Sequence, residues 1–304
     1  EKLGQDSVLG QLFYKKDHTH TTAQGASLAA FIVARELKSA REEFGNYVLE
    51  NPKITLPKKK QLYLIGDSTV ADNDLDQAVG WGVALEKFID TNRVRIVNAA
   101  RGGRSSRTFY TEKLWEKVYD TLKKGDYLLM QFGHNDGGYI DQPKYRGSIS
   151  GISDSTLVVK REGQPAETVH SYGWYMNHFI QQTLDKGAIA VVLSPVPRNQ
   201  WDGEKVIRNN ESYGLWAKEI ALKNNVLFID LNDSIARAYQ KIGRDKVHWF
   251  FPKDHTHTNL AGATFNAAVL AQSLRQCKQL GLKDFLVSQQ TIDELLGAVL
   301  SIND

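Results

Sequence analysis

Short apolar runs alternate with amphipathic helical patterns through most of the chain. Five runs predict strands buried on both faces, at residues 62–65, 94–98, 127–132, 188–194 and 226–230. The helical patterns lie at residues 81–91, 111–123, 171–186, 211–224 and 260–275. This alternation predicts an α/β fold, a three-layer α/β/α sandwich with a five-stranded parallel sheet, in which ligands bind at the carboxyl ends of the strands.

Residues 136–170 interrupt the alternation. They contain glycines and charged residues and show little periodicity. A loop of this length inside a compact domain is usually functional or mobile. Because it directly follows a polar motif at residues 133–136, we expect it to form a wall or lid of the ligand cleft.

The chain contains an internal repeat. Residues 16–21 read Lys-Asp-His-Thr-His-Thr, as do residues 253–258, and the likeness continues into an alanine-rich amphipathic helix. The repeat predicts that residues 1–50 are the helical tail of a preceding tandem copy of the domain at residues 61–304. Residues 51–60, with two prolines and a basic run, are then the linker. The alternative is a chance match, and an N-terminal helix that packs on the main domain is compatible with either interpretation.

Composition narrows the classes of function. With 41% hydrophobic residues among 304, the chain can bury a sizeable core. The 38 basic and 35 acidic residues are too balanced to indicate nucleic-acid binding. The single cysteine, Cys277, cannot form an intramolecular disulfide, and no apolar run approaches the roughly 20 residues of a membrane span. The start at Glu1 without a signal peptide is compatible with removal of a leader or of a longer preceding sequence.

Ser68 is the first candidate for chemistry. It follows the first predicted strand in Leu-Ile-Gly-Asp-Ser-Thr. A serine at a sharp strand-to-helix turn can direct its hydroxyl into a cleft, and amides at such a helix start can stabilise an anion. The alternative is that Asp67 or Ser68 caps a helix.

Asp254 and His257 are the second candidates, at a spacing of three residues before the helix near Asn259. A serine hydroxyl needs a base to accept its proton, and imidazole is suited to this near neutral pH. A carboxylate on the other ring nitrogen fixes the tautomer and stabilises the imidazolium. One alternative is that Asp254 caps the helix, and another is a metal bound by Asp254, His255 and His257.

Two further motifs follow the second and third predicted strands. The segment at residues 98–107 contains Gly103, where glycine lets a backbone N–H approach a ligand closely. In the motif at residues 133–136, the amide of Asn135 can serve as a hydrogen-bond donor in the cleft. The alternatives are a flexible loop and an ordinary turn.

The ordered set of these motifs resembles the SGNH (GDSL) hydrolase superfamily. The matching blocks are Gly66-Asp67-Ser68, Gly103, Gly133-His134-Asn135-Asp136 and Asp254-His255-Thr256-His257. Residues 80–82, 103–105 and 251–258 are similar to the rhamnogalacturonan acetylesterase branch. The resemblance covers roughly residues 60–275, and the extra N-terminal segment departs from the pattern.

The resemblance implies a flavodoxin-like fold and a serine esterase that removes acetyl groups from pectin-type polysaccharide (rhamnogalacturonan). Ser68 is then the nucleophile, His257 the base and Asp254 its orienting carboxylate. The N–H groups of Ser68 and Gly103 and the side chain of Asn135 form the oxyanion hole. It also implies no metal or organic cofactor, an acetylated polysaccharide or oligosaccharide as substrate, and a periplasmic or secreted location.

Other functions remain open on the sequence alone. They are deacetylation of xylan or another glycan, lipid or thioester hydrolysis, and non-catalytic glycan binding. Candidates for binding an anionic chain or stacking on sugar rings are Arg104, Arg107, Arg198, Trp81, Trp174 and Trp201, the alternative being surface arginines and core tryptophans. In the repeat, Asp17 and His20 have no Gly-Asp-Ser partner upstream in this chain, so we expect them to be catalytically silent.

Overall fold

The computed structural model describes residues 12–13, 19–40, 59–73, 78–277 and 281–301. The chain divides into two compact units, Glu1–Lys59 and Lys60–Asp304, and each is described by itself. Asp17 and most of the predicted linker lie outside the described residues. No helix within the described ranges is long and apolar enough to cross a membrane.

The larger unit is built on a parallel sheet. Its strands stand in the order β2-β1-β3-β6-β9, and every pair in it is parallel. The bounds are β1 Lys60–Gly66, β2 Val94–Asn98, β3 Tyr127–Gln131, β6 Ile189–Leu193 and β9 Leu227–Ile229. The predicted five-stranded parallel sheet is therefore confirmed, and its carboxyl ends share one edge. The chain adds β2 on one side of β1 and then β3 on the other side, so the strand order reverses at β1. In folds of this kind, ligands bind at such a switch point.

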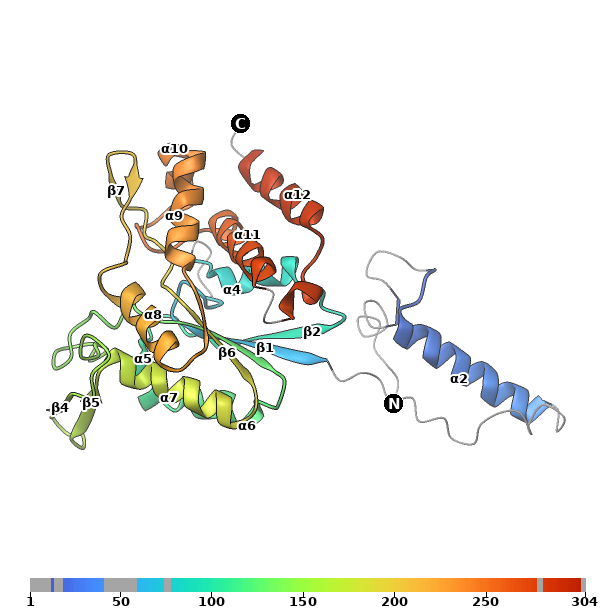
Figure 1. The fold of residues 1–304 in the computed structure, drawn as a ribbon, viewed down its shortest axis with the longest axis horizontal. Helices are drawn as coiled ribbons and strands as arrows, with labels where there is room; N and C mark the ends of the chain where they lie inside the picture. Colours follow the sequence, from blue (N-terminus) through green and yellow to red (C-terminus); the bar gives the residue numbers. More distant parts are fainter. Residues whose placement is uncertain (1–11, 14–18, 41–58, 74–77, 278–280, 302–304) are drawn as a thin grey trace. The chain divides into compact units, whose positions relative to one another are not determined.

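Alternate side chains of the strands enter two hydrophobic cores, because successive residues of a strand point to opposite faces. Leu64 and Leu129 belong to one core, and Tyr63 and Leu128 to the other. Helices cover both faces (Figure 1). The first core contains residues of α4 (Trp81–Ala84), η1 (Leu85–Phe88), α9 (Leu231–Ile242), α10 (Arg244–Trp249), α11 (Leu260–Gln276), η3 (Leu282–Phe285) and α12 (Gln289–Leu300). The second contains residues of α5 (Ser106–Thr111), α6 (Leu114–Thr121), α7 (Tyr172–Asp185) and α8 (Tyr213–Lys223).

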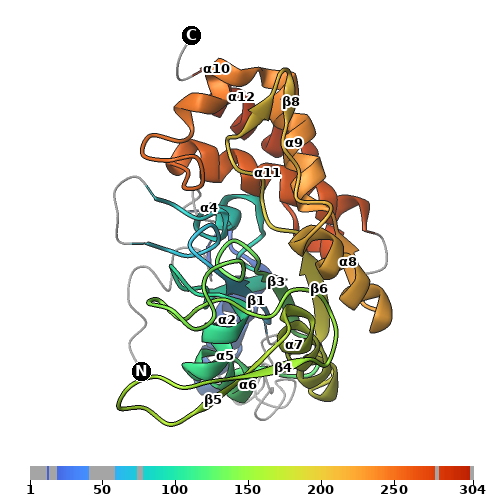
Figure 2. The ribbon, with the colours of Figure 1, turned by 90° about the vertical axis from the view of Figure 1, so that its left-hand side faces the viewer.

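The structure adds elements that the sequence pattern did not predict. Helices α9 and α12 are absent from the predicted set, and the predicted helix at residues 81–91 is the short pair α4 and η1. The segment at residues 136–170 contains a hairpin of β4 (Thr156–Val159) and β5 (Glu167–His170). A smaller hairpin joins β7 (Trp201–Asp202) to β8 (Lys205–Val206). Both hairpins lie toward the carboxyl ends of the strands, the side that faces the viewer in Figure 2.

The smaller unit contains the predicted N-terminal helix, α2 (Ala23–Ala40). Its start matches the start of α11, since Ala23 and Leu260 are 237 residues apart, like the two copies of the repeated motif. The caps match as well. Thr22 Oγ1 accepts the N–H of Gly25 at 3.2 Å, and Asn259 Oδ1 accepts the N–H of Gly262 at 2.9 Å. The sequence repeat is therefore also a repeat of local structure.

Candidate active site

Ser68 lies in a tight turn directly after β1, at the carboxyl edge of the sheet. The buried side chain of Asp67 accepts hydrogen bonds from the backbone N–H (2.9 Å) and the hydroxyl (2.7 Å) of Thr69. A Cβ at Gly66 would come within 2.6 Å of the carbonyl oxygen of Gln131, so glycine is needed where the chain passes β3. The turn is therefore fixed on both sides of Ser68.

His257 and Asp254 reach Ser68 from the loop before α11. Ser68 Oγ is 2.9 Å from His257 Nε2, and His257 Nδ1 is 2.7 Å from Asp254 Oδ2. An ionised carboxylate only accepts hydrogen bonds, so in the neutral ring Nδ1 carries the proton and Nε2 presents its lone pair to the hydroxyl of Ser68. The structure thus brings the three predicted side chains together, with a hydroxyl facing a base and the base held by a carboxylate.

The turn around Asp254 favours its ionised form. Asp254 Oδ1 accepts the N–H groups of Thr256 (2.7 Å) and His257 (2.8 Å). Partial burial raises the pKa of this carboxyl, but the hydrogen bonds from the ring and backbone of His257 and from Thr256 outweigh it and lower the pKa to about 2. The carboxylate can therefore stabilise an imidazolium. The side chains of His257 and Asp254 are 32% and 42% exposed, so a large substrate can reach them.

The loop before α11 is anchored at both ends. Asn259, not Asp254, caps the helix, so the capping alternative for Asp254 is wrong. The backbone N–H of Asn259 donates to the carbonyl of Phe250 at 2.8 Å. The backbone carbonyl of Thr258 accepts the N–H of Val79 at 2.8 Å, and the hydroxyl of Thr258 donates to the carbonyl of Val79 at 2.9 Å. These bonds hold the loop against the segment that precedes α4.

The loop that carries Gly103 passes close to Ser68 at the preceding residue, Gly102. A Cβ on Gly102 would lie 3.9 Å from the Cβ of Ser68, and Gly103 has a φ of +74°, which favours glycine. Within the described ranges, the N–H groups of Ser68 and Gly103 have no hydrogen-bond partner. Asn135 is 7% exposed and donates one amide proton to the carbonyl of Arg104 at 2.8 Å, which leaves the second proton for a ligand.

Asp136 joins the second and third motifs. Both of its oxygens accept the N–H of Ser106 at 3.2 Å, and Oδ1 also accepts the hydroxyls of Ser106 and Ser148. Burial raises the pKa of Asp136 and these hydrogen bonds lower it. Burial has the larger effect, so the pKa is raised to about 6. Since α5 begins at Ser106, this carboxyl group positions the loop that carries Gly103 relative to Asn135.

Sequence reasoning missed a buried pair beneath Ser68. Asp67 Oδ2 is 3.1 Å from His134 Nδ1, and His134 Nε2 is 2.9 Å from the carbonyl oxygen of Val196. Burial raises the pKa of Asp67, but His134 and Thr69 outweigh this effect and the pKa is lowered, so the carboxyl is ionised. Both ring nitrogens of His134 therefore face oxygen acceptors, one on the side chain of Asp67 and one on the backbone of Val196. Only the histidine in the motif at residues 133–136 could have signalled this pair.

Two predicted substrate-binding residues are structural instead. Arg107 is fully buried and makes a bidentate ion pair with Glu167, at 2.7 and 2.9 Å, which ties residues 136–170 to α5. Trp81 is 1% exposed and donates its Nε1–H to Gln131 Oε1 at 2.9 Å. The binding roles predicted for Arg107 and Trp81 are therefore wrong, because neither side chain can reach a substrate without unfolding the core.

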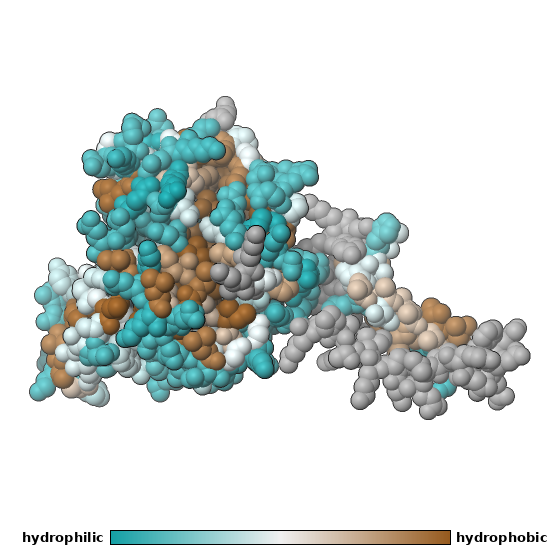
Figure 3. All heavy atoms as spheres, viewed as in Figure 1, coloured by the Kyte–Doolittle hydropathy of each residue, from teal (hydrophilic) through white to brown (hydrophobic). Residues whose placement is uncertain are grey.

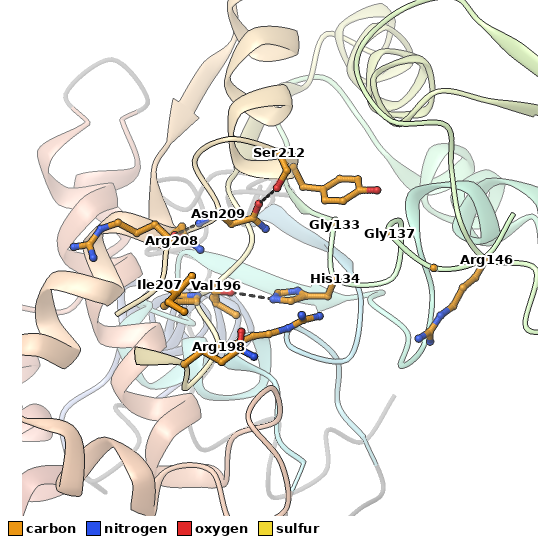
Figure 4. Close-up of a pocket in the computed structure, with 15 residues that line it drawn as sticks. Gly133, His134, Gly137, Arg146, Val196, Arg198, Ile207, Arg208, Asn209 and Ser212 are labelled. Atoms are coloured by element: carbon orange, nitrogen blue, oxygen red, sulfur yellow. Dashed lines mark hydrogen bonds between the residues drawn. The ribbon is translucent and has the colours of Figure 1, made fainter. Parts of the chain in front are cut away.

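The other binding candidates are at least partly accessible. Arg104 pairs with Glu112 at 2.9 Å on the surface, and Trp201 donates to Asn199 Oδ1 at 2.7 Å. The ring of Trp174 stacks on that of His170 with a centroid distance of 3.8 Å. Arg198, the remaining candidate, lines a pocket of about 490 Å³ that also includes His134 (Figure 4).

Comparison with known proteins agrees with these motifs. Residues 64–265 match the model of the GDSL-like lipase/acylhydrolase family. The chain is 32% identical to a rhamnogalacturonan acetylesterase of Emericella nidulans over 74% of its own length and 88% of the relative's. It is 28% identical to YesY of Bacillus subtilis, named a probable rhamnogalacturonan acetylesterase, over 73% and 94%.

The crystal structure of protein YxiM from Bacillus subtilis shares the fold, with a TM-score of 0.60 and 24% identity, and the match covers 72% of this chain and 57% of that one. The family match begins within β1, includes the other four strands of the parallel sheet, and covers all four motif loops, from the turn of Ser68 to that of His257. The chain belongs to the GDSL-like lipase/acylhydrolase family.

Proposed function

We propose that this serine esterase removes acetyl groups from rhamnogalacturonan, with Ser68 as its nucleophile. The observation that carries the proposal is the 2.9 Å contact between Ser68 Oγ and His257 Nε2, in a ring whose other nitrogen is held by Asp254. Two relatives whose names specify acetylesterase activity on this polysaccharide support the substrate.

The mechanism has two halves. Ser68 Oγ attacks the acetyl carbonyl carbon while His257 Nε2 accepts the hydroxyl proton, and Asp254 stabilises the imidazolium. His257 then protonates the departing sugar oxygen, which leaves an acetyl group on Ser68. In the second half, water attacks this acetyl-enzyme with His257 again as the base, and acetate leaves.

Three hydrogen-bond donors are proposed to stabilise the negative oxygen of the tetrahedral intermediates. They are the backbone N–H groups of Ser68 and Gly103 and the second amide proton of Asn135. None of them has to give up a bond to another described residue before it binds the oxyanion. Such preorganised donors act more strongly than water because they need no reorientation as charge develops.

The surroundings favour a glycan over a lipid. The side chains of His257 and Asp254 are open to solvent, and the adjacent pocket is lined mainly by polar and charged residues. An acyl chain would require an apolar groove instead. A polymer outside the cell would also require export of the enzyme to the periplasm or the medium, which cell fractionation tests.

The test is the Ser68→Ala variant, with Ser153→Ala as a matched control that removes a hydroxyl from an exposed loop. Ser68→Ala should lower kcat for acetate release by on the order of 10⁴–10⁶ without changing the circular dichroism spectrum. The control should keep full activity. Retained hydrolysis in Ser68→Ala would refute the nucleophile, and acetate release from acetylated xylan but not from acetylated rhamnogalacturonan would refute the substrate.

A further inference from the structure

The pocket in Figure 4 is strongly basic and includes His134, which belongs to the buried pair beneath Ser68. It is lined by the loop after β3, including Gly133 and His134, and by the segments at residues 196–200 and 207–213. His134 contacts Asp67, the neighbour of Ser68 in sequence, so one wall of the pocket is continuous with the nucleophile turn. The lining residues include three arginines and no aspartate or glutamate.

One of these arginines, Arg208, already has a carboxylate partner within the protein. Arg208 Nε is 2.8 Å from Asp233 Oδ1, and its Nη1 donates to the carbonyl of Val206 and to Gln240 Oε1. In Figure 4 its guanidinium group turns away from the centre of the pocket. The guanidinium group of Arg208 is therefore already engaged within the protein.

Arg146 and Arg198 differ from Arg208. They come from different loops, and Figure 4 shows their guanidinium groups directed toward the same space from opposite sides. Within the described part of the chain, the guanidinium group of neither residue has an ion-pair or hydrogen-bond partner. The Nε atom of Arg198 is buried and still lacks an acceptor. A buried donor without a partner is costly, so it indicates a group that arrives with the ligand.

The chemistry of that group follows from the donors. A guanidinium group presents parallel N–H donors that match the two oxygens of a carboxylate, and such charge-assisted pairs are the strong ones. A neutral sugar would leave both positive charges uncompensated in a pocket without acidic residues. The geometry points to a subsite in which Arg146 and Arg198 bind the carboxylate of a uronic acid unit adjacent to the acetylated unit, an inference that rests on the proposed function.

The test compares two substrates that differ only in whether their carboxyl groups are charged. Acetylated rhamnogalacturonan oligosaccharides are used as free acids and after methyl esterification of their carboxyl groups, and acetate release is measured. Arg198→Gln and Arg146→Gln should each lower kcat/KM on the free acid about 10- to 100-fold, through KM, because each removes a charge-assisted hydrogen bond. Hydrolysis of the methyl-esterified substrate and of p-nitrophenyl acetate should stay unchanged.

Arg95→Gln is the matched control, since it removes the same charge from an exposed position on β2. It should leave all three substrates unaffected. Equal kcat/KM of the wild type on the charged and esterified oligosaccharides would overturn the subsite, as would equal losses on all substrates in the Arg198 variant. Failure of the proposed function has a different signature, because the wild type would then hydrolyse p-nitrophenyl acetate but release no acetate from either oligosaccharide.

A second, independent observation concerns α2. Its residues match those of α11 at the constant offset, including Ala34 with Ala271 and Leu37 with Leu274. Leu274 is fully buried in the larger unit, whereas Leu37 is 43% exposed. Other apolar residues of α2 are exposed as well, and Figure 3 shows them along the helix. The sequence of a core helix therefore recurs in α2, where the described apolar residues Ile32, Val33 and Leu37 are exposed.

We infer that α2 is the terminal helix of a second SGNH-like domain, which precedes Glu1 in the full-length protein. In the larger unit, α11 packs in one core with residues of α4, η1 and α9. We expect the second domain to present a similar apolar layer to α2. An antibody against this chain should detect in the producing organism one polypeptide that is larger than 34.2 kDa by about a domain, with peptides of a second Gly-Asp-Ser motif. A native protein of 34.2 kDa, or one whose dimers dissociate on Leu37→Glu, would overturn the inference.

Discussion

The buried contact between Asp67 and His134 offers the sharpest test of how the nucleophile is positioned. The side chains of Asp67 and His134 are 0% and 6% exposed, so neither can be solvated if its partner is lost. Replacing His134 by phenylalanine keeps a ring in the space but leaves the carboxylate of Asp67 with only Thr69 as donor. Breaking a buried pair in this way costs about 3–5 kcal/mol of unfolding free energy.

The same change should lower activity beyond its effect on folding. Asp67 holds the N–H and hydroxyl of Thr69, and Ser68 lies between these two residues. Without His134, the Asp67 carboxylate is expected to reorient and to move the turn, which shifts the Ser68 hydroxyl relative to His257. A displacement of about 1 Å can cost on the order of 10²-fold in rate. We therefore expect kcat for p-nitrophenyl acetate to fall about 100-fold in His134→Phe at temperatures where the variant is folded.

The assay is a double-mutant cycle by urea unfolding with Asp67→Asn, His134→Phe and the double variant. The double variant should be more stable than the sum of the single losses predicts, with a coupling energy of at least about 1 kcal/mol. His178→Phe is the matched control, since His178 is half-buried on α7 and its ring packs against those of Tyr110 and Trp174. Losses that add within about 0.5 kcal/mol would refute the claim that the two residues act as a pair.

Three further predictions concern the site and the core. Asn135→Ala should lower kcat by about 10²–10³ with little change in KM, measured by acetate release, if its amide binds the oxyanion. Asp136 has a pKa of about 6 in the folded protein against 3.8 ordinarily, so the folded state retains a proton that the unfolded state loses. Its contribution to stability is present below pH 3.8 and should decrease by roughly 3 kcal/mol as pH rises through 6, measured by urea unfolding against Asp136→Asn. Leu274→Ala should destabilise the larger unit by about 2–5 kcal/mol, whereas Leu37→Ala, its counterpart in the repeat, should not.

The sheet could be predicted because strands buried on both faces are continuous apolar runs, which a sequence displays directly. Helix α9 was missed although Leu231, Ile235 and Tyr239 recur at the spacing of a buried helical face. Asp230 looked like the end of a strand, but its side chain accepts the N–H of Asp233 and caps the helix. The error therefore lay in the boundary, where one polar residue can end a strand or begin a helix.

In the candidate site, too, some residues could be predicted from the sequence and others could not. The motif residues Ser68, Asp254 and His257 were predictable because each follows a strand or precedes a helix in a fixed local pattern. Arg107 was not, since its burial depends on Glu167, which lies 60 residues away along the chain. No local pattern distinguishes an arginine that awaits a substrate from one whose carboxylate partner arrives from a distant hairpin.

This difference explains which of the arginines can define specificity. Arg107 and Arg208 have protein carboxylates as partners, at 2.7 and 2.8 Å, so a substrate would have to displace an existing pair to use them. Arg146 and Arg198 have no such competitor among the described residues, and they lie in the pocket that shares a wall with the nucleophile turn. A carboxylate bound there would add to the attraction without breaking a bond within the protein. Selectivity for an anionic glycan is therefore expected to depend on the arginines that the fold leaves unpaired, and not on the net charge of +3.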